Sequence, residues 1–266
     1  MRNYFRAIAS QLRRDLTRRR NISASMLEVE RAEQMFYLQY LREGMVVFDV
    51  GASVGELTLL FSRFVGEGQV HAFEASSVVF ERLRTVTGAA ACPNVFINHL
   101  AVAEAEGKVR LNVYDERHLG WNTLANRPLE NYGIDVKPVA IEDVEATTID
   151  NYCEREGIGK IDLLKIDVEG AEFQVLTGAH RMLREQRIAC ITFEFGQTTF
   201  DMGNDPDEIE AYLIELGYKL RNMVAGDTVF PGRKAAQNAR FSMHVATPSG
   251  SDAMLTSLPE LDVPAS

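Results

Sequence analysis

Short apolar segments rich in β-branched residues alternate with segments of helical periodicity along most of the chain. Strands are predicted over residues 45–50, 69–73, 94–98, 108–114, 162–166, 189–195, 218–223 and 241–246. Helices are predicted over residues 25–41, 77–86, 171–184 and 206–216. Strand and helix signals that alternate in this way indicate βαβ units. The pattern therefore predicts an α/β fold with a doubly wound, mostly parallel sheet that is covered on both faces.

The two ends of the chain differ from this alternating middle. Residues 1–43 are predicted to form a helical extension that begins with a basic arm, and residues 44–247 to form the main domain. Residues 248–266 are rich in Pro, Ser and Asp, a composition typical of a disordered tail. Much of 226–240 is likewise expected to be disordered or to form a mobile loop.

The chain is acidic overall, but its charge is unevenly distributed. Its 266 residues are 46% apolar and 25% charged, which is ordinary for a globular protein, and the net charge is −10. Residues 1–20 contain seven arginines and one aspartate, so they carry +6 and the remainder carries −16. An acidic body argues against nucleic acid as a partner, because phosphate binding needs a basic face.

The basic arm has two interpretations that the sequence leaves open. Phe5, Ile8, Leu12 and Leu16 recur at helical spacing with arginines between them. Such a helix could lie on an anionic membrane surface as a peripheral contact. It could equally pack on its own domain or on a second copy of the chain, which would make the protein a homo-oligomer.

Cysteine usage and the lack of long apolar runs indicate the compartment. No apolar run approaches about 18 residues, and the N-terminus lacks the apolar core of a secretory signal. Cys92, Cys153 and Cys190 are too widely spaced for a disulfide framework or a metal motif, and each lies beside apolar residues. We therefore expect buried thiols and a cytoplasmic protein, with peripheral membrane contact through the arm as an option.

The stretch VFDVGASVGEL, residues 47–57, joins the first clear strand to a helix. Its G-x-S-x-G pattern is that of a hydrolase elbow, with Ser53 as the nucleophile and the late His244 as its base. The same stretch is a glycine-rich turn of the kind that holds a nucleotide-like cofactor. The turn follows the first strand, whereas a hydrolase elbow follows a central one. Its position favours the cofactor loop.

An acidic residue at the end of the next strand supports this interpretation. Glu74 follows the strand 69–73, where a carboxylate can accept both hydroxyls of a ribose. Ser53 replaces the middle glycine that makes room for the pyrophosphate of a dinucleotide. S-adenosylmethionine has no phosphate, and an aspartate before the loop suits its positive charge. With glycines that let the backbone approach the ligand, the predicted cofactor residues of this loop are Asp49, Gly51, Ser53, Gly55 and Glu74.

A second block, LLKIDVEGAEFQVLTGA at 163–179, gathers four charged residues where a buried strand meets a helix. Such charges are costly unless they are solvated or engaged with a ligand. Together with FDVGASVG, ATTIDNYC (146–153) and ITFEF (191–195), this block closely resembles the signature of the FkbM family of S-adenosylmethionine-dependent methyltransferases. The resemblance covers roughly 44–247. There are two departures: FEASSVVF has no proline after the acid, and GWNTL (120–124) replaces a serine-rich segment.

The resemblance implies a fold, a cofactor and a reaction. The fold is the seven-stranded, mostly parallel, Rossmann-like sheet of class I methyltransferases, and the cofactor is S-adenosylmethionine. The reaction is methylation of an oxygen, typically a hydroxyl on a sugar, glycolipid or polyketide-like molecule. We therefore expect a small-molecule or glycan acceptor. Two alternatives remain: a binding protein that keeps the fold without catalysis, and a serine hydrolase that uses Ser53.

A hydroxyl acceptor needs a base that removes its proton as the new bond forms. Asp167 is the first candidate, because it lies at the carboxyl end of a strand, where open α/β sheets bind their ligands. Glu194 ends the adjacent strand and is the second candidate. His244 and His99 are further candidates, although His244 alternates with Met243 and Val245 and so also fits a core histidine.

Several further roles are less sharply defined by the sequence. Lys165 and Glu169 could orient the base or form a structural ion pair, and Trp121 could stack on a sugar ring or serve as a buried anchor. Adenine is expected beyond the third strand, near Asn98 and Ala101, with Asp167 also at the cofactor. Asp167 and Glu194 could offer two oxygen ligands to Mg²⁺, but no dedicated metal spacing is present and no metal is predicted.

Overall fold

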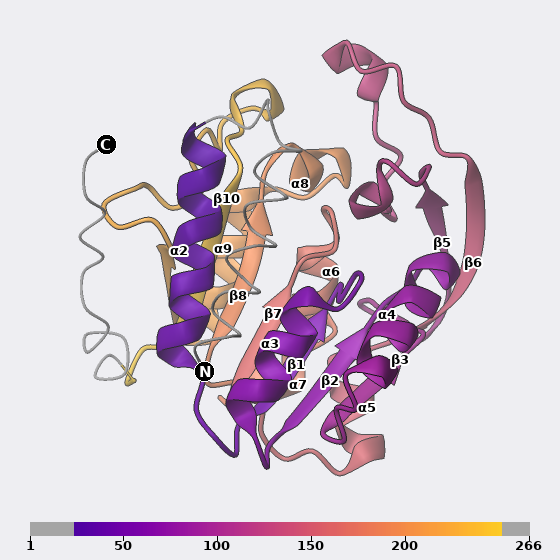
Figure 1. The fold of residues 1–266 in the computed structure, drawn as a ribbon. Coiled ribbons are helices and arrows are strands. Elements are labelled where there is room, and N and C mark those ends of the chain that lie inside the picture. The colour runs from indigo at the N-terminus through magenta and orange to yellow at the C-terminus, as the bar shows by residue number, and fades with distance from the viewer. Residues whose placement is uncertain (1–23, 252–266) are drawn as a thin grey trace.

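The computed structural model describes residues 24–251, so the basic arm and residues 252–266 lie outside it. A central sheet has seven strands in the order β3-β2-β1-β7-β8-β10-β9, and only β10 runs antiparallel to its neighbours (Figure 1). This confirms the predicted doubly wound, mostly parallel sheet. The strands are β1 (Val46–Val50), β2 (Gln69–Phe73), β3 (Val95–Asn98), β7 (Leu163–Ile166), β8 (Ile191–Phe195), β9 (Tyr218–Asn222) and β10 (Ser242–Pro248).

Helices cover both faces of this sheet because adjacent strand residues point to opposite sides. Val47 and Leu163 pack with one group of helices, whereas Phe48 and Leu164 pack with the other. The first face carries α2 (Ala24–Tyr40), α3 (Glu56–Val65) and α4 (Ser77–Ala89). The second carries α5 (Ile149–Glu156), α6 (Glu172–Thr177), α7 (His180–Arg184) and α9 (Pro206–Glu215), and the short α8 (Gln197–Asp201) follows β8.

The single helix predicted over 171–184 is two helices, α6 and α7, and Asp150 explains the break. The carbonyl of Gly178 accepts from the Asp150 N–H (3.1 Å). The Asp150 carboxylate accepts from the N–H groups of Arg181 (2.7 Å) and Met182 (3.0 Å) at the start of α7. Gly178 also lies so close to the Ala103 carbonyl oxygen that an added Cβ would be 2.1 Å from it. Tertiary hydrogen bonds therefore replace the helical ones here.

A second, three-stranded sheet with the order β4-β6-β5 lies beside the first. The sequence predicted β5 (Gly107–Val113) but missed β4 (Ala101–Val102) and β6 (Ala140–Thr147). The connection between β5 and β6, residues 114–139, contains two short 3₁₀ turns, Leu119–Trp121 and Leu129–Tyr132. This long connection matters for function because it reaches back to the main sheet.

The disorder predicted for much of 226–240 is wrong. Phe230 in this segment is buried against Phe195 and His244. Arg233 pairs with carboxylates of α9, and Arg240 pairs with Asp227 at 2.7 Å. The segment is poor in regular structure, but its one large aromatic side chain anchors it to the core. The strand β10 also continues to Pro248, one residue into the predicted tail, whose remainder beyond 251 lies outside the described residues.

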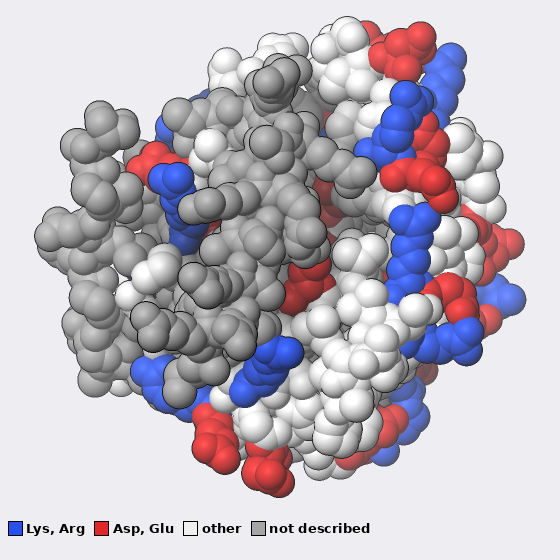
Figure 2. Space-filling model, viewed as in Figure 1, with Lys and Arg blue, Asp and Glu red and all other residues white. Residues whose placement is uncertain are grey.

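The described surface mixes charges of both signs. In Figure 2, Lys and Arg side chains lie beside Asp and Glu side chains across the visible described part of this face. Arg82 and Glu116, for example, form an exposed pair at 3.0 Å. Among residues 24–251, no helix is both long and apolar enough to cross a membrane.

Candidate active site

The loop after β1 is built by backbone packing. The N–H groups of Gly51 and Ala52 both donate to the Phe73 carbonyl, at 3.0 and 2.9 Å. Gly51 has φ +77°, and an added Cβ would lie 1.8 Å from the carbonyl oxygen of Asp167. At Gly55, with φ +88°, a Cβ would lie 2.7 Å from a Leu83 methyl group. Neighbouring protein atoms therefore already require these glycines, and the predicted clearance for a ligand stays a prediction.

Glu74 holds this loop in place from the end of β2. Its buried carboxylate accepts from the N–H groups of Ser53 (2.9 Å) and Ser76 (2.8 Å). Burial raises the pKa of Glu74, and the two backbone hydrogen bonds oppose that rise. Ser53 has a left-handed backbone conformation, with φ +49°, and its N–H points toward the Glu74 carboxylate. The residue predicted to bind the ribose thus also fixes the shape of the glycine loop.

A buried ion pair links β1 to β7. Asp49 accepts from the Thr58 hydroxyl (2.6 Å) and lies 3.1 Å from the Lys165 ammonium. Lys165 also donates to the Gly51 carbonyl (2.8 Å) and lies 3.6 Å from Asp167. Burial disfavours the ammonium, but the surrounding carboxylates outweigh it and raise the pKa of Lys165. Asp49 therefore anchors Lys165 beneath the loop and does not line the cavity described below.

Helix α2 contributes a carboxylate beside this ion pair that sequence analysis missed. Glu33 accepts from the Tyr37 hydroxyl (3.0 Å), which also shares a hydrogen bond with Thr192 (3.0 Å). Thr192 on β8 is the register partner of Lys165 on β7. Burial and the charge of Asp167 raise the pKa of Glu33 to about 7. Only the spacing of Glu33 and Tyr37, one helical turn apart, hinted at this contact.

Three carboxylates converge where β7 and β8 end. Asp167, Glu169 and Glu194 each offer an oxygen, and these oxygens all lie within 4.8 Å of one another. Burial and the charges of Glu169 and Asp167 raise the pKa of Glu194 well above its ordinary value. Burial and the charge of Asp167 raise the pKa of Glu169 to about 8, and Arg127 opposes this rise. Like charges so close together disfavour each other's ionised form, which contributes to the raised pKa of Glu169 and of Glu194.

The remaining acid of this block, Glu172, has a structural role. It is buried, and one oxygen accepts from the N–H groups of Val168 and Gly170, both at 3.1 Å. Burial raises its pKa to about 7, while the backbone hydrogen bonds lower it. The acids of the 163–179 block therefore separate into two that face the cavity, Asp167 and Glu169, and one that shapes the turn between them and α6.

A cavity of about 310 Å³ lies between the glycine loop, the end of β2 and the three carboxylates. Its walls also include residues of the 114–139 connection, among them Asn122 and Leu124. Four carboxylate side chains and no Lys or Arg of the described residues line it. The structure brings six of the predicted site residues to this cavity: Gly51, Ser53, Glu74, Ala101, Asp167 and Glu194.

Other predicted site residues have roles away from the cavity. The Asn98 amide donates to the carbonyls of Ala72 (3.2 Å) and Phe96 (3.1 Å), so it ties strand edges together. His99 is exposed, stacks on a phenylalanine ring and does not line the cavity. Asn98 does not line the cavity either, so its predicted contact with adenine stays a prediction.

His244 is a core histidine, the second of its two sequence interpretations. It is buried among Phe193, Phe195 and Phe230, and its Nε2 accepts from the Phe230 N–H at 3.2 Å. Burial lowers its pKa to about 3. A neutral, enclosed imidazole away from the cavity cannot take a proton from an acceptor or activate Ser53. No histidine among the described residues lines the cavity, which removes the base that the hydrolase alternative requires.

Arg127 is a site residue that the sequence did not reveal. Its guanidinium lies 3.6 Å from Glu169 and 3.4 Å from Asp201, and 5.4 Å from the centre of the Trp121 ring. The Arg127 side chain is nine-tenths buried, so these charges act at low solvent exposure. Trp121 thus supports Arg127 and does not line the cofactor-side cavity. The 114–139 connection has no periodicity that would single out this arginine.

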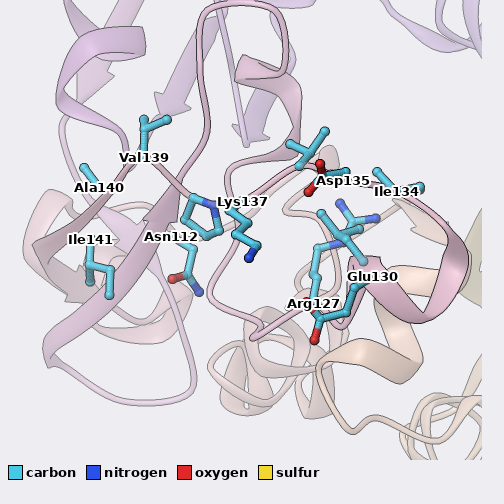
Figure 3. Close-up of a pocket in the computed structure, with 12 residues that line it drawn as sticks. Asn112, Arg127, Glu130, Ile134, Asp135, Lys137, Val139, Ala140 and Ile141 are labelled. Atoms are coloured by element: carbon cyan, nitrogen blue, oxygen red, sulfur yellow. The ribbon is translucent and has the colours of Figure 1, made fainter.

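A second cavity, of about 560 Å³, has Arg127 in its wall. Its walls are Asn112, Arg127 and residues from 129 to 141, and Figure 3 shows the Lys137 side chain extending into it. Seven of its twelve lining residues are apolar, including the exposed Val139 and Ile141. Two cations, two carboxylates and Asn112 complete the wall. Arg127 therefore lines this mostly apolar cavity and also contacts Glu169, which lines the acidic one.

The chemistry of the smaller cavity fits a cation that carries a ribose. Glu74 offers carboxylate oxygens of the kind that accept ribose hydroxyls. Asp167, Glu169 and Glu194 provide negative charge for a cationic centre, and the absence of lining Lys and Arg among the described residues disfavours a phosphate. These properties match S-adenosylmethionine, which has a sulfonium and an ammonium and no phosphate. They also suit a hard divalent cation at the three carboxylates.

The strand order, the glycine loop and the acid that ends β2 together define a Rossmann-like class I methyltransferase. Comparison with known protein families then identifies the family within this class. Residues 49–220 match the model described as the methyltransferase FkbM domain, which spans most of the chain. The chain belongs to the FkbM family of S-adenosylmethionine-dependent methyltransferases, as its sequence motifs indicated.

Individual relatives are more distant. The 31-O-demethyl-FK506 methyltransferase FkbM of Streptomyces tacrolimicus is 32% identical over 173 residues, which are 52% of this chain and 60% of that protein. The methyltransferase sdnD of Sordaria araneosa is 28% identical over 199 residues, 65% of this chain and 73% of that protein. A crystal structure of methyltransferase FkbM from Methylobacillus flagellatus aligns with a TM-score of 0.48 at 16% identity, over 76% of this chain and 43% of that one.

Proposed function

We propose that this chain transfers a methyl group from S-adenosylmethionine to a hydroxyl oxygen of a small-molecule or glycan acceptor. The observation that carries the proposal is the convergence of Asp167, Glu169 and Glu194 on one cavity whose opposite wall is Glu74. The cofactor, when bound, supplies an electrophilic methyl group. The protein then has to hold the acceptor in line and remove its proton.

Asp167 is proposed as the base. Its side chain is 41% exposed, so it is the most accessible of the three carboxylates to an entering hydroxyl. The pKa of Glu194 is raised well above its ordinary value, in part by the charge of Asp167, whose carboxylate oxygen lies within 4.8 Å. In its protonated form Glu194 can donate to Asp167 and orient it toward the acceptor. Geometry of this kind supplies much of the acceleration of an in-line transfer.

Two further observations support an oxygen acceptor of some size. The relative from Streptomyces tacrolimicus is named for methylation of 31-O-demethyl-FK506, a transfer to oxygen. The larger cavity that Arg127 lines offers room and apolar surface for the parts of an acceptor that do not react. The absence of described Lys and Arg from the smaller cavity favours acceptors without phosphate and disfavours nucleic acid.

Calorimetric titration with S-adenosylmethionine tests the cofactor site. Glu74→Ala removes the carboxylate at the ribose position and should weaken binding by about 1.5–3 kcal/mol, the scale of hydrogen bonds to a charged group. Glu81→Ala, an exposed acid on α4, is the matched control and should leave affinity unchanged. Equal affinities of the wild type and Glu74→Ala would reject the ribose assignment.

Methyl transfer from labelled S-adenosylmethionine to a library of hydroxylated acceptors tests the reaction. Transfer to oxygen in at least one class of compound is the expected result. Tight cofactor binding without transfer to any member would instead favour a binding protein that keeps the fold.

A divalent cation at Asp167, Glu169 and Glu194 is a second candidate for activating the hydroxyl, because their oxygens lie within 4.8 Å of one another. Chelation with EDTA, followed by an activity assay, separates the two accounts. Full activity after chelation supports proton removal by the carboxylates alone. Loss of activity that added Mg²⁺ restores would shift the account to metal-assisted deprotonation.

Peripheral membrane contact and self-association stay proposals that rest on the basic arm, which lies outside the described residues. Flotation with anionic vesicles, with and without residues 1–20, tests the first. Equal, negligible flotation of both proteins would reject it.

A further inference from the structure

Helix α2 begins on the side of the main sheet where the carboxylates converge. The Tyr40 hydroxyl donates to the carbonyl of Asp162 (2.9 Å), which directly precedes β7. Nearly one turn earlier in the helix, Tyr37 shares a hydrogen bond with Thr192 (3.0 Å), which lies level with the carboxyl half of β7. The helix therefore runs antiparallel to β7 and β8 (Figure 1). Ala24, its first residue, lies about 20 Å beyond Tyr37 along the helix axis, past the carboxyl ends of these strands.

The cavity of about 310 Å³ and helix α2 are neighbours. Phe241 lines this cavity, and it also packs against the apolar cluster that contains Phe36 and Tyr37 of α2. Glu194 of β8, the strand whose Thr192 contacts Tyr37, lines the same cavity. The chain that precedes Ala24 therefore joins the described fold beside the cavity.

The charges of the cavity and of the basic arm, residues 1–20, are opposite. Four carboxylate side chains line the cavity, and no Lys or Arg of the described residues does. The side chain of Asp167 is 41% exposed and that of Glu169 is 22% exposed, so a cation that arrives from solvent can reach both. The basic arm carries seven arginines and one aspartate. Even as a helix, the 23 residues before Ala24 would extend about 35 Å, enough to cross a small domain.

We propose that, in the absence of S-adenosylmethionine, the basic arm docks over the exposed carboxylates of the cavity, with arginines beside Asp167 and Glu169. Arginine suits this position because its guanidinium forms paired hydrogen bonds with a carboxylate. The proposal rests on the proposed cofactor site, and it takes the second interpretation of the arm, packing on its own domain. S-adenosylmethionine brings positive charge to the same carboxylates. The arm and the cofactor therefore compete, and the docked arm lowers the apparent affinity for the cofactor.

Calorimetric titration of the full-length chain with S-adenosylmethionine tests this competition. In one variant, glutamine replaces the seven arginines of the basic arm, which keeps its length and removes its positive charge. This variant should bind S-adenosylmethionine at least about fivefold more tightly than the wild type. A second variant, with lysine at the same seven positions, keeps the charge and is the matched control. Its affinity should stay close to that of the wild type.

Salt provides a second test of the same contact. The affinity advantage of the glutamine variant should be largest at about 50 mM salt and should disappear near about 0.5 M, because salt screens exposed charges. Equal affinities of the wild type and the glutamine variant at both concentrations would overturn the proposal. Tighter binding by the wild type at low salt would also overturn it, because the arm would then assist the cofactor and not compete with it.

Photo-crosslinking locates the arm. The crosslinking residue p-benzoylphenylalanine replaces Phe5, and mass spectrometry identifies the products after irradiation. Crosslinks within one chain should reach segments that line the cavity, such as residues 119–124 and 167–171, and S-adenosylmethionine should reduce them. Crosslinks between two chains, or crosslinks that the cofactor does not change, would contradict docking at the cavity.

Failure of this proposal can be distinguished from failure of the proposed function. If neither the wild type nor the glutamine variant binds S-adenosylmethionine at either salt concentration, the proposed cofactor site fails together with the docking of the arm. If both bind it equally well and both transfer methyl groups to an acceptor, only the docking of the arm fails.

Discussion

Two groups of charged side chains meet at the carboxyl ends of β1, β7 and β8, and they differ in how their charge is balanced. In the first, Lys165 lies 3.1 Å from Asp49 and donates to a backbone carbonyl, and Asp49 also accepts from a threonine. This ion pair is enclosed and closely matched. In the second, Asp167, Glu169 and Glu194 face one cavity, with Arg127 beside Glu169 and the already paired Lys165 beside Asp167.

The first group stabilises the fold, and the second faces the cavity where we expect the reaction. Removing one partner of a buried ion pair destabilises the protein, because the other charge is left uncompensated. Carboxylates with too few counter-charges have raised pKa values and gain from a cationic ligand or a shared proton. The K-I-D-V-E-G-A-E block contributes residues to both groups, so neighbours in sequence have opposite roles.

The largest effect is expected from breaking the matched pair. Lys165→Met would leave Asp49 buried without its cation and should lower the free energy of unfolding by about 3–5 kcal/mol. Urea denaturation followed by circular dichroism measures this. The double variant Asp49→Asn with Lys165→Met removes both charges and should recover part of the loss. A Lys165→Met protein as stable as the wild type would contradict the scaffold role.

The pH dependence of stability sharpens the comparison. The pKa of Glu172 rises from an ordinary 4.5 in the unfolded chain to about 7 in the fold. An acid with a raised folded pKa stabilises fully below pH 4.5, and this stability is lost as pH rises towards 7. Glu172→Gln keeps an oxygen for the Val168 and Gly170 N–H groups. It should match the wild type near pH 4.5 and exceed it by up to about 3 kcal/mol at pH 7.5.

The difference between variant and wild type isolates Glu172 from other titrating groups. The pKa values of His71 and His244 are lowered by burial to about 4 and about 3, so these residues add stability as pH rises, in both proteins alike. Glu81→Gln, at an exposed acid, is the control and should show no such divergence. A constant difference across the pH range would contradict the raised pKa of Glu172.

The smallest effect concerns the cation of the second group. Arg127 lowers the pKa of Glu169, so Arg127→Met should raise it further. The pH–rate profile of methyl transfer should then move to higher pH by roughly one unit. Arg82→Met, which removes an exposed arginine, should leave the profile in place. A profile that moves to lower pH, or does not move, would show that Arg127 does not act on the carboxylates.

The strands of the main sheet and several of the helices beside them could be predicted from the sequence, because apolar periodicity reports burial directly. The glycine loop, Glu74 and Asp167 could be located for a related reason: they stand at strand ends, and parallel strand ends meet at one edge of a sheet. A further reason for the glycines, packing against other parts of the fold, could not be predicted. The Asp167 carbonyl against Gly51 comes from another strand, and no local pattern encodes it.

The residues that were missed depend on long-range packing. Arg127 lies on a connection without periodicity, and only the return of this connection to Glu169 gives it a role. Glu33 reads as an ordinary polar position of α2 until Tyr37 and Thr192 are placed beside it. The sequence left two interpretations of His244, a catalytic base and a core residue, because strand alternation does not show which face of the sheet carries the cavity.

Turnover of Asp167→Asn tests the central claim, that unbalanced carboxylates remove the acceptor proton. The substitution keeps the shape of the side chain and removes its capacity as a base. Methyl transfer measured at saturating S-adenosylmethionine should fall by about 10²- to 10⁴-fold, so that weaker cofactor binding does not contribute to the loss. Asp143→Asn, at an exposed aspartate of β6, should have normal turnover. Near-normal turnover of Asp167→Asn would contradict the account and move the search for the base to Glu194 or Glu169.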